Sequence, residues 1–266
     1  MTDTPDMTPL DTAHAAMEAA PADDAARLRF FERLADSELF LLLAEEVAGD
    51  NVTPRVFSVE GGSYVLVFDR EERLADFVGE PAPYVALSGR LIATMLKDQE
   101  IGLGVNLSVA PSSILMPAEA ISWLANTLAQ APNEVEAKPV EVSAPQGVPE
   151  ALLSALDTKL VSAAGLAPLV YLVGVEYEDG QHGHMLAFID AADGAEGALA
   201  QAASEALTFS GIEAGAMDVA FFAASDPIAA SLARVGLRFD IPEPAKPQAV
   251  APKAPGMDPQ KPPKLR

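Results

Sequence analysis

The chain has 266 residues, half of them apolar, with no cysteine and a formal net charge of −22. Its size and hydrophobicity predict one large or two medium globular domains whose core needs no covalent cross-links. The lack of cysteine excludes disulfides, thiolate nucleophiles, iron–sulfur clusters and cysteine-ligated zinc, and it fits a reducing compartment.

The charge is unevenly distributed. Residues 241–266 carry a formal charge of +3, so the preceding 240 residues carry −25. Such an acidic body repels a phosphate backbone and an anionic membrane surface. We therefore expect no nucleic acid and no membrane among its partners, and a protein partner with a basic surface.

The sequence shows no targeting signal. Residues 1–24 hold six acidic residues and neither lysine nor arginine, whereas a secretory signal has a basic start and an apolar stretch. No run approaches the roughly 18 apolar residues that a membrane-spanning helix needs. We expect a cytoplasmic protein.

Two segments divide the chain. Residues 131–147 are rich in Pro, Glu and Val without helical periodicity, and residues 241–266 contain eight prolines. Such segments bury little surface, so we predict a linker and a disordered tail. The predicted domains are 1–130 and 148–240.

Helices and strands alternate through the first domain. Leu28, Phe31 and Leu34 recur at helical spacing, and runs of branched and aromatic residues predict strands. The predicted helices lie at 9–20, 23–35, 70–78, 89–97 and 117–128, and the strands at 38–47, 54–60, 63–69, 83–88, 101–108 and 112–116.

Three helix ends in this domain carry sequence signals. Asp69 and Glu72 have the spacing of a capping box for the helix at 70–78, which Gly79 would end. Ser88 would cap the helix at 89–97.

The second domain has a similar order. The predicted helices lie at 149–163, 195–208 and 227–235, and the strands at 168–178, 184–190, 217–223 and 237–241. Asp226 would cap the last helix, Pro227 takes its first position and Gly236 would end it.

Both halves share the order helix, hairpin, helix, strand, helix, strand. "SYVLVFD" corresponds to "HMLAFID", and "IATMLKDQEIGLGVNL" to "IAASLARVGLRFDI". We predict a mixed α/β fold of two tandem, related small domains. The alternative is that strand–helix–strand sequence recurs by chance in α/β proteins.

The best candidate for an anion or ligand contact is "SGR", Ser88, Gly89 and Arg90, between a strand and a helix. Amides at a helix N-terminus together with an arginine can hold a carboxylate or phosphate. Ordinary capping by Ser88 explains the same residues.

His182 and His184 lie in "EDGQHGHML" and face the same side of an extended chain. Zinc needs at least three protein ligands, and the third histidine of the chain, His14, lies far away in the sequence. Asp179-Gly180 is a turn signal, so we expect residues 178–183 to form a hairpin loop without a metal.

Other motifs point to no chemistry. Neither G-x-S-x-G nor a phosphate-binding glycine loop is present, and adjacent acids such as Glu71 and Glu72 point in different directions on a helix. We predict no catalytic residues and no cofactor. Pro259 and Pro262 have the P-x-x-P spacing of a polyproline ligand, or belong to a solubilising tail.

The quoted strands and helices also resemble a known family. "FFERLADSELFLLL", "YVLVFDREERLADF" and "YVALSGRLIATMLKDQEIGLGVN" resemble the N-terminal domain of SseB-type proteins, and "GLAPLVYLVGVEYEDGQHGHMLAFID" is similar to their C-terminal domain. Leu107 follows Asn106, where the family usually has proline. The resemblance implies two α/β domains, and no activity or cofactor that could be carried over.

The sequence thus favours a non-enzymatic interaction or regulatory module. The alternative is a sensor of a small metabolite, such as an amino acid, that binds near strand ends or between the domains. A pocket shared by the domains would favour the sensor, and a flat apolar patch the interaction module.

Overall fold

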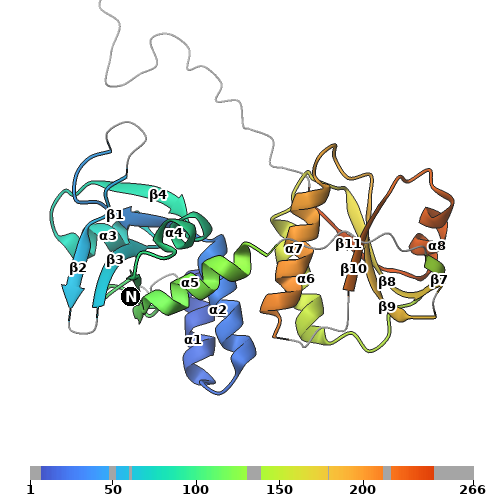
Figure 1. Ribbon diagram of the computed structural model, residues 1–266, viewed down its shortest axis with the longest axis horizontal. Coiled ribbons are helices and arrows are strands. Elements are labelled where there is room, and N and C mark those ends of the chain that lie inside the picture. The colour runs from blue at the N-terminus through green and yellow to red at the C-terminus, as the bar shows by residue number, and fades with distance from the viewer. Residues whose placement is uncertain are drawn as a thin grey trace, which may run out of the picture.

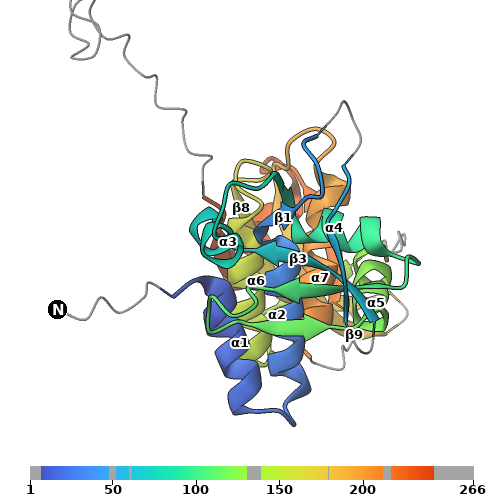
Figure 2. The same cartoon turned by 90° about the vertical axis from the view of Figure 1, so that its left-hand side faces the viewer.

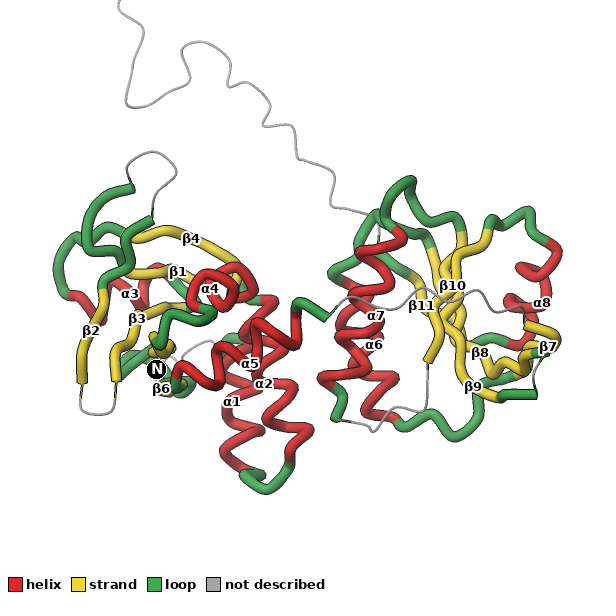
Figure 3. Tube along the Cα trace, viewed as in Figure 1, coloured by secondary structure: helices red, strands yellow, loops and turns green. Residues whose placement is uncertain are grey.

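The computed structural model describes residues 7–47, 52–59, 62–130, 139–178, 180–211 and 217–242. They form two α/β domains, each with its own mixed sheet. Figure 1 shows the helices α1, α2, α5, α6 and α7 between the two sheets, with α8 on the outer face of the second sheet. Figure 3 shows the same layers, with a helical zone between two groups of strands.

The first domain contains a six-stranded sheet in the order β4-β1-β3-β5-β6, with β2 paired to β3. The pair β3 and β5 is parallel and the other pairs are antiparallel. The bounds are α1 Pro9–Ala19, α2 Asp24–Asp36, β1 Glu38–Leu42, β2 Val56–Val59, β3 Gly62–Phe68, α3 Glu71–Val78, β4 Tyr84–Ser88, α4 Gly89–Leu96, β5 Ile101–Val105, β6 Ile114–Met116 and α5 Ala118–Leu128.

The second domain contains the order β10-β9-β8-β11, with β7 paired to β8. The pair β9 and β10 is parallel and the others are antiparallel. The bounds are β7 Pro139–Ser143, α6 Glu150–Val161, β8 Leu169–Tyr177, β9 His182–Ile189, α7 Glu196–Phe209, β10 Met217–Phe222, α8 Pro227–Val235 and β11 Leu237–Asp240. The mixed α/β class and its two-sheet architecture agree with the sequence prediction.

The two halves share a strand layout but not its connectivity. The rows β4-β1-β3-β5 and β11-β8-β9-β10 have the same parallel and antiparallel neighbours. In the first domain the next strand after β3 is β4, which pairs with β1. In the second domain the next strand after β9 is β10, which pairs with β9 itself. The predicted correspondence of "IGLGVNL" with "LRFDI" is therefore wrong, because β5 is a parallel neighbour of β3 and β11 an antiparallel neighbour of β8.

The predicted domain boundaries need correction at two places. Residues 131–147 are not only a linker, because β7 adds a strand to β8 and begins the second domain; residues 131–138 lie outside the described part. Alternating Val140 and Val142 carried the strand pattern, which the prolines obscured. Ile241, assigned to the tail, is 6% exposed in the core of the second domain. The rest of the predicted tail, 243–266, lies outside the described residues.

Helix ends follow most sequence signals. Gly79 ends α3 in the left-handed conformation and Ser88 caps α4, as predicted. The capping box is wrong: α3 begins after Arg70 without a side-chain cap, and Asp69 instead accepts hydrogen bonds from Thr8 and Arg73. Asp226 likewise makes no side-chain cap, because its carboxylate accepts from the Ala223 amide.

One residue of the second domain packs in the core of the first. Phe209, at the end of α7, is fully buried in the cluster that α1, α2, α4 and α5 form on the first sheet. Its ring centroid lies 6.5 Å from that of Trp123 on α5, which in turn lies 5.1 Å from that of Phe31 on α2. The domains therefore share an apolar contact.

We expect Phe209→Ala to destabilise the docking of the domains by about 3–5 kcal/mol, the usual cost of deleting a buried phenyl group. Because Trp123 is the only tryptophan, its emission should shift to the red as the contact opens. The control is Phe222→Ala, which removes a half-buried ring on the α8 side of the second sheet. An equal shift of Trp123 emission in both variants would contradict the docking role.

Candidate functional site

The predicted anion contact lies at the interface of the domains. The Ser88 hydroxyl accepts from the Leu91 amide at 3.3 Å. The Gly89 amide donates to Ser37 at 2.9 Å, and a Cβ at this position would lie 1.9 Å from the Leu34 carbonyl oxygen, so only glycine fits. Arg90 points to the second domain.

The anion that Arg90 holds is a carboxylate of this chain. Its guanidinium donates to both oxygens of Glu205 on α7, at 2.7 and 2.8 Å, and to Asp36 on α2 at 3.2 Å. The bidentate geometry is the strong form of an arginine–carboxylate pair. Ser88 therefore caps α4, Gly89 allows close packing, and Arg90 joins the domains.

Lys159 on α6 forms the centre of this contact. Its ammonium lies 2.6 Å from Asp36, 2.8 Å from Glu205 and 3.8 Å from Glu32. The Lys159 side chain is 6% exposed and that of Glu205 4%. We call Glu32, Asp36, Arg90, Lys159 and Glu205 the interdomain charge cluster.

The pKa values of Glu205, Lys159 and Glu32 are shifted in different ways within the cluster. Burial alone would raise the pKa of Glu205, but hydrogen bonds from Arg90, Lys159 and Gln201 lower it to about 2. Burial lowers the pKa of Lys159, and the carboxylates of Asp36 and Glu205 more than reverse this, so the amine stays charged. Burial raises the pKa of Glu32 to about 7, against the attraction of Lys159. Glu32 is thus the member that titrates near neutral pH.

A groove of about 550 Å³ lies next to the cluster, between α1 and α2 of the first domain and α6 of the second. Figure 2 shows α1 and α2 as a helical hairpin that extends beyond the first sheet. Residues of this hairpin and of α6 line the groove together. Its polar lining consists of Thr12, Arg29, Glu32, Arg33, Ser154 and Thr158. Small apolar residues form the rest of the lining: Pro9, Ala13, Ala16, Ala26, Ala151 and Ala155. Glu32 belongs to both the groove and the charge cluster.

The strand ends of the first domain, the usual ligand position of α/β sheets, are filled by α1. Asp69 follows β3 and Asn106 follows β5, its parallel neighbour. The fully buried Asp11 of α1 enters this space, where it accepts from Arg73 at 2.5 and 3.1 Å and from Ser112 at 2.5 Å. Burial would raise the pKa of Asp11, but these bonds hold it well below its usual range.

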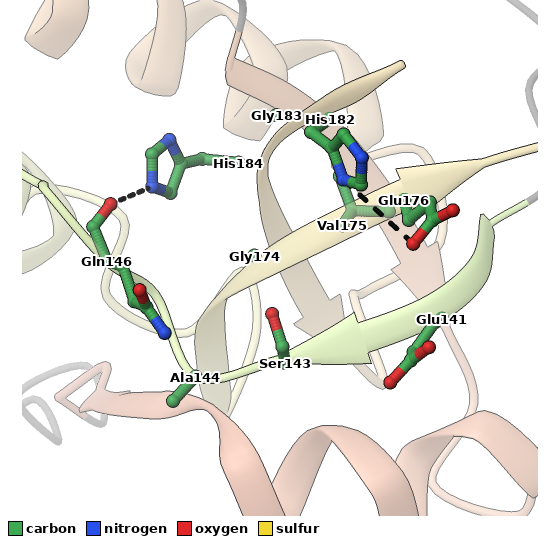
Figure 4. A pocket seen from close by; sticks show the side chains of 10 residues that line it. All are labelled: Glu141, Ser143, Ala144, Gln146, Gly174, Val175, Glu176, His182, Gly183 and His184. Atoms are coloured by element: carbon green, nitrogen blue, oxygen red, sulfur yellow. Dashed lines mark hydrogen bonds and ion pairs between the residues drawn. The ribbon is translucent and has the colours of Figure 1, made fainter. Parts of the chain in front are cut away.

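The two histidines line a surface hollow of about 570 Å³ over β7, β8 and β9. The prediction that His182 lies in the hairpin loop is wrong. His182 begins β9 opposite Glu176, because the Tyr177 amide donates to the Gln181 carbonyl and closes the turn before it. Figure 4 shows the two imidazoles turned toward different partners: His182 lies 4.0 Å from Glu176, and His184 lies 3.0 Å from the Gln146 carbonyl oxygen.

Among the described residues, no three His, Asp or Glu side chains come together in a geometry suited to a metal ion. None of the helices in the same residues has the length and hydropathy needed to cross a membrane. The interdomain groove and charge cluster are therefore the site that the geometry singles out, because their polar groups come from both domains.

Sequence reasoning found one member of this site and missed the others. Arg90 was predicted from its position after a strand. Lys159 and Glu205 lie on helices that read as ordinary amphipathic segments, and only their burial distinguishes them. One signal was available for Lys159, which lies at helical spacing from Leu152 and Leu156, where an unpaired charge would be costly.

Comparison with known protein families places part of the first domain. Residues 13–123 match the family model described as SseB protein N-terminal domain. No curated protein and no solved structure matches the chain. The resemblance of residues 148–240 to an SseB C-terminal domain remains a prediction.

The raised pKa of Glu32 predicts a pH-dependent stability. Between about pH 4.5 and 7 the folded chain binds a proton at Glu32 that the unfolded chain does not, so stability falls as pH rises through this window. The loss amounts to at most about 3 kcal/mol. Glu32→Gln mimics the protonated form and should remove this part of the slope, as measured by chemical unfolding from pH 5 to 8. Glu18→Gln, at an exposed position of α1, is the control; an unchanged slope in Glu32→Gln contradicts the assignment.

The histidines should matter little to stability. We expect His182→Ala to change the free energy of unfolding by less than about 0.5 kcal/mol, because exposed positions rarely contribute more. His184→Ala loses the bond to Gln146 and should cost about 1 kcal/mol. The purified chain should carry no stoichiometric metal. Metal analysis that finds one zinc per chain, absent from the double variant, would refute this.

Proposed function

The chain belongs to the SseB family through its first domain, and from this premise we propose that it is a non-enzymatic regulatory protein that binds a small ligand between its domains. The observation that carries the proposal is the groove that α1, α2 and α6 form together. A ligand there contacts both domains at once. Binding therefore favours the docked arrangement over any arrangement in which the domains separate.

The charge cluster supports a regulatory role rather than a purely stabilising one. A buried ion pair often contributes less to stability than an apolar pair of the same size, but it fixes one geometry. Here Lys159 fixes α6 against α2, and Glu32 links this contact to the groove. A ligand that alters the charge or position of Glu32 alters the interdomain contact. We place this activity in the cytoplasm, which the lack of cysteine supports.

The second candidate, a protein-interaction module, has its own supporting observation. Among the described residues, no strand pairs with the outer edge of β10. This strand, Met217–Phe222, has one charged residue, Asp218, and neither the proline nor the lysine that usually protects an edge. An extended basic segment of a protein partner would add to this edge as a further strand. The partner of the regulatory module is proposed to bind there, with no role for nucleic acid, membrane or cofactor.

A metabolite panel tests the proposed function. Compounds are added to the purified chain, and the thermal midpoint and the emission of Trp123 are followed together. We expect a ligand that raises the midpoint and changes the emission, since Trp123 lies against Phe209 of the other domain. Ala151→Leu fills the groove and should abolish both responses, whereas Ala198→Leu, on the exposed side of α7, should leave them intact.

Two outcomes separate the candidates. If no compound produces a response that Ala151→Leu abolishes, the ligand-binding role fails. If Ala220→Pro on β10 abolishes capture of a partner from cell extract while Ala151→Leu has no effect, the chain acts as an interaction module alone.

A further inference from the structure

We propose that the groove binds a small organic monoanion, a carboxylate on an apolar body; this rests on the proposed function and names its ligand class. The proposal comes from how charge and apolar surface are distributed within the groove. At about 550 Å³ the groove has the size of a small-molecule site.

Two guanidinium groups line one wall. Arg29 and Arg33 are one turn apart on α2, so they share a face of that helix. Arg29 has only a loose pair, 3.5 Å from Asp23, in which both side chains are more than 40% exposed. Such exposed pairs contribute little, so a ligand can replace Asp23 at small cost. Arg33 forms no salt bridge with any residue in the described ranges. Both cations are thus available to a carboxylate.

Two of the three hydroxyl groups in the lining, those of Thr12 and Thr158, cannot donate to a second negative group. Thr12 on α1 and Thr158 on α6 already donate their hydroxyl protons to helix carbonyls, at 3.1 and 2.8 Å. Their oxygens can then only accept hydrogen bonds, which a second carboxylate cannot donate. Small apolar side chains from all three helices form most of the remaining lining: Ala13, Ala16, Ala26, Ala151 and Ala155. One charged end and an apolar body therefore fit this surface.

Glu32 couples binding to pH. The charged groups around it are Arg33 and Asp36 on α2, Lys159 on α6 and Glu205 on α7. An ionised Glu32 repels a bound carboxylate, while a protonated Glu32 can donate a hydrogen bond to it. A carboxylate ligand should therefore bind more tightly at pH 6 than at pH 8, and a cation should show the reverse.

Three probes of equal chain length test the ligand class: hexanoate, hexan-1-ol and hexylammonium. Binding to the full chain is measured by calorimetry and Trp123 emission at pH 6 and pH 8. We expect hexanoate to bind most tightly, with higher affinity at pH 6, and Glu32→Gln to remove that difference. Arg29→Gln and Arg33→Gln should each lower the affinity by about tenfold or more, since each removes hydrogen bonds to a charged group. Arg27→Gln is the matched control, because Arg27 lies on the same helix, is exposed and pairs with Asp24 outside the groove.

The proposal is overturned if hexylammonium binds more tightly than hexanoate, or if Arg27→Gln weakens hexanoate as much as Arg33→Gln does. In either case a metabolite response that Ala151→Leu abolishes would still support the proposed function. If the metabolite panel fails as well, the ligand class and the function fail together.

Discussion

The buried ammonium of Lys159 constrains the whole arrangement of the chain. A charge that is 6% exposed is tolerated only with carboxylates in contact, and these come from both domains: Asp36 from α2 and Glu205 from α7. Removing one partner of such a cluster leaves another charge buried and uncompensated, which typically costs about 3–5 kcal/mol. The polar contact therefore favours the docked arrangement, and in this arrangement Phe209 also packs into the core of the first domain.

This constraint also decides where a ligand can bind. The strand ends of the first domain are closed by α1, and Arg90, the predicted anion contact, is bound by Glu205. Between the domains, a groove remains open beside the cluster, where the helical hairpin of the first domain meets α6. Folding thus pairs the buried charges with one another. It leaves Arg29, whose ion pair with Asp23 is exposed, and Arg33, which has no salt bridge among the described residues, next to a carboxyl that titrates near neutral pH.

Local features were predictable from the sequence, and long-range ones were not. The fold class, the stripe Ile121, Leu124, Ala125 and Leu128 of α5, the C-terminus of α3 and the N-terminus of α4 all follow from patterns within a few residues. On α2 the predicted face was incomplete: Phe30 and Leu34 are buried in the core, while Phe31 packs at its edge with its ring against that of Trp123. The strand order, the pairing of β7 and the partner of Arg90 depend on residues up to 115 positions away, which no local pattern encodes.

The filling of the strand ends by α1 bears on what counts as a domain in this protein. The stretch that matches the SseB N-terminal family starts at residue 13, whereas Thr8 and Asp11 lie before it. Those two residues hold Arg73 and Asp69, which are nearly buried. A unit cut at the edge of sequence similarity would thus keep the guanidinium and lose half of its counter-charge. The first domain therefore needs residues that precede the matched stretch. The carboxylate of Asp11, in the first turn of α1, fills the position at the strand ends where other α/β proteins bind a ligand.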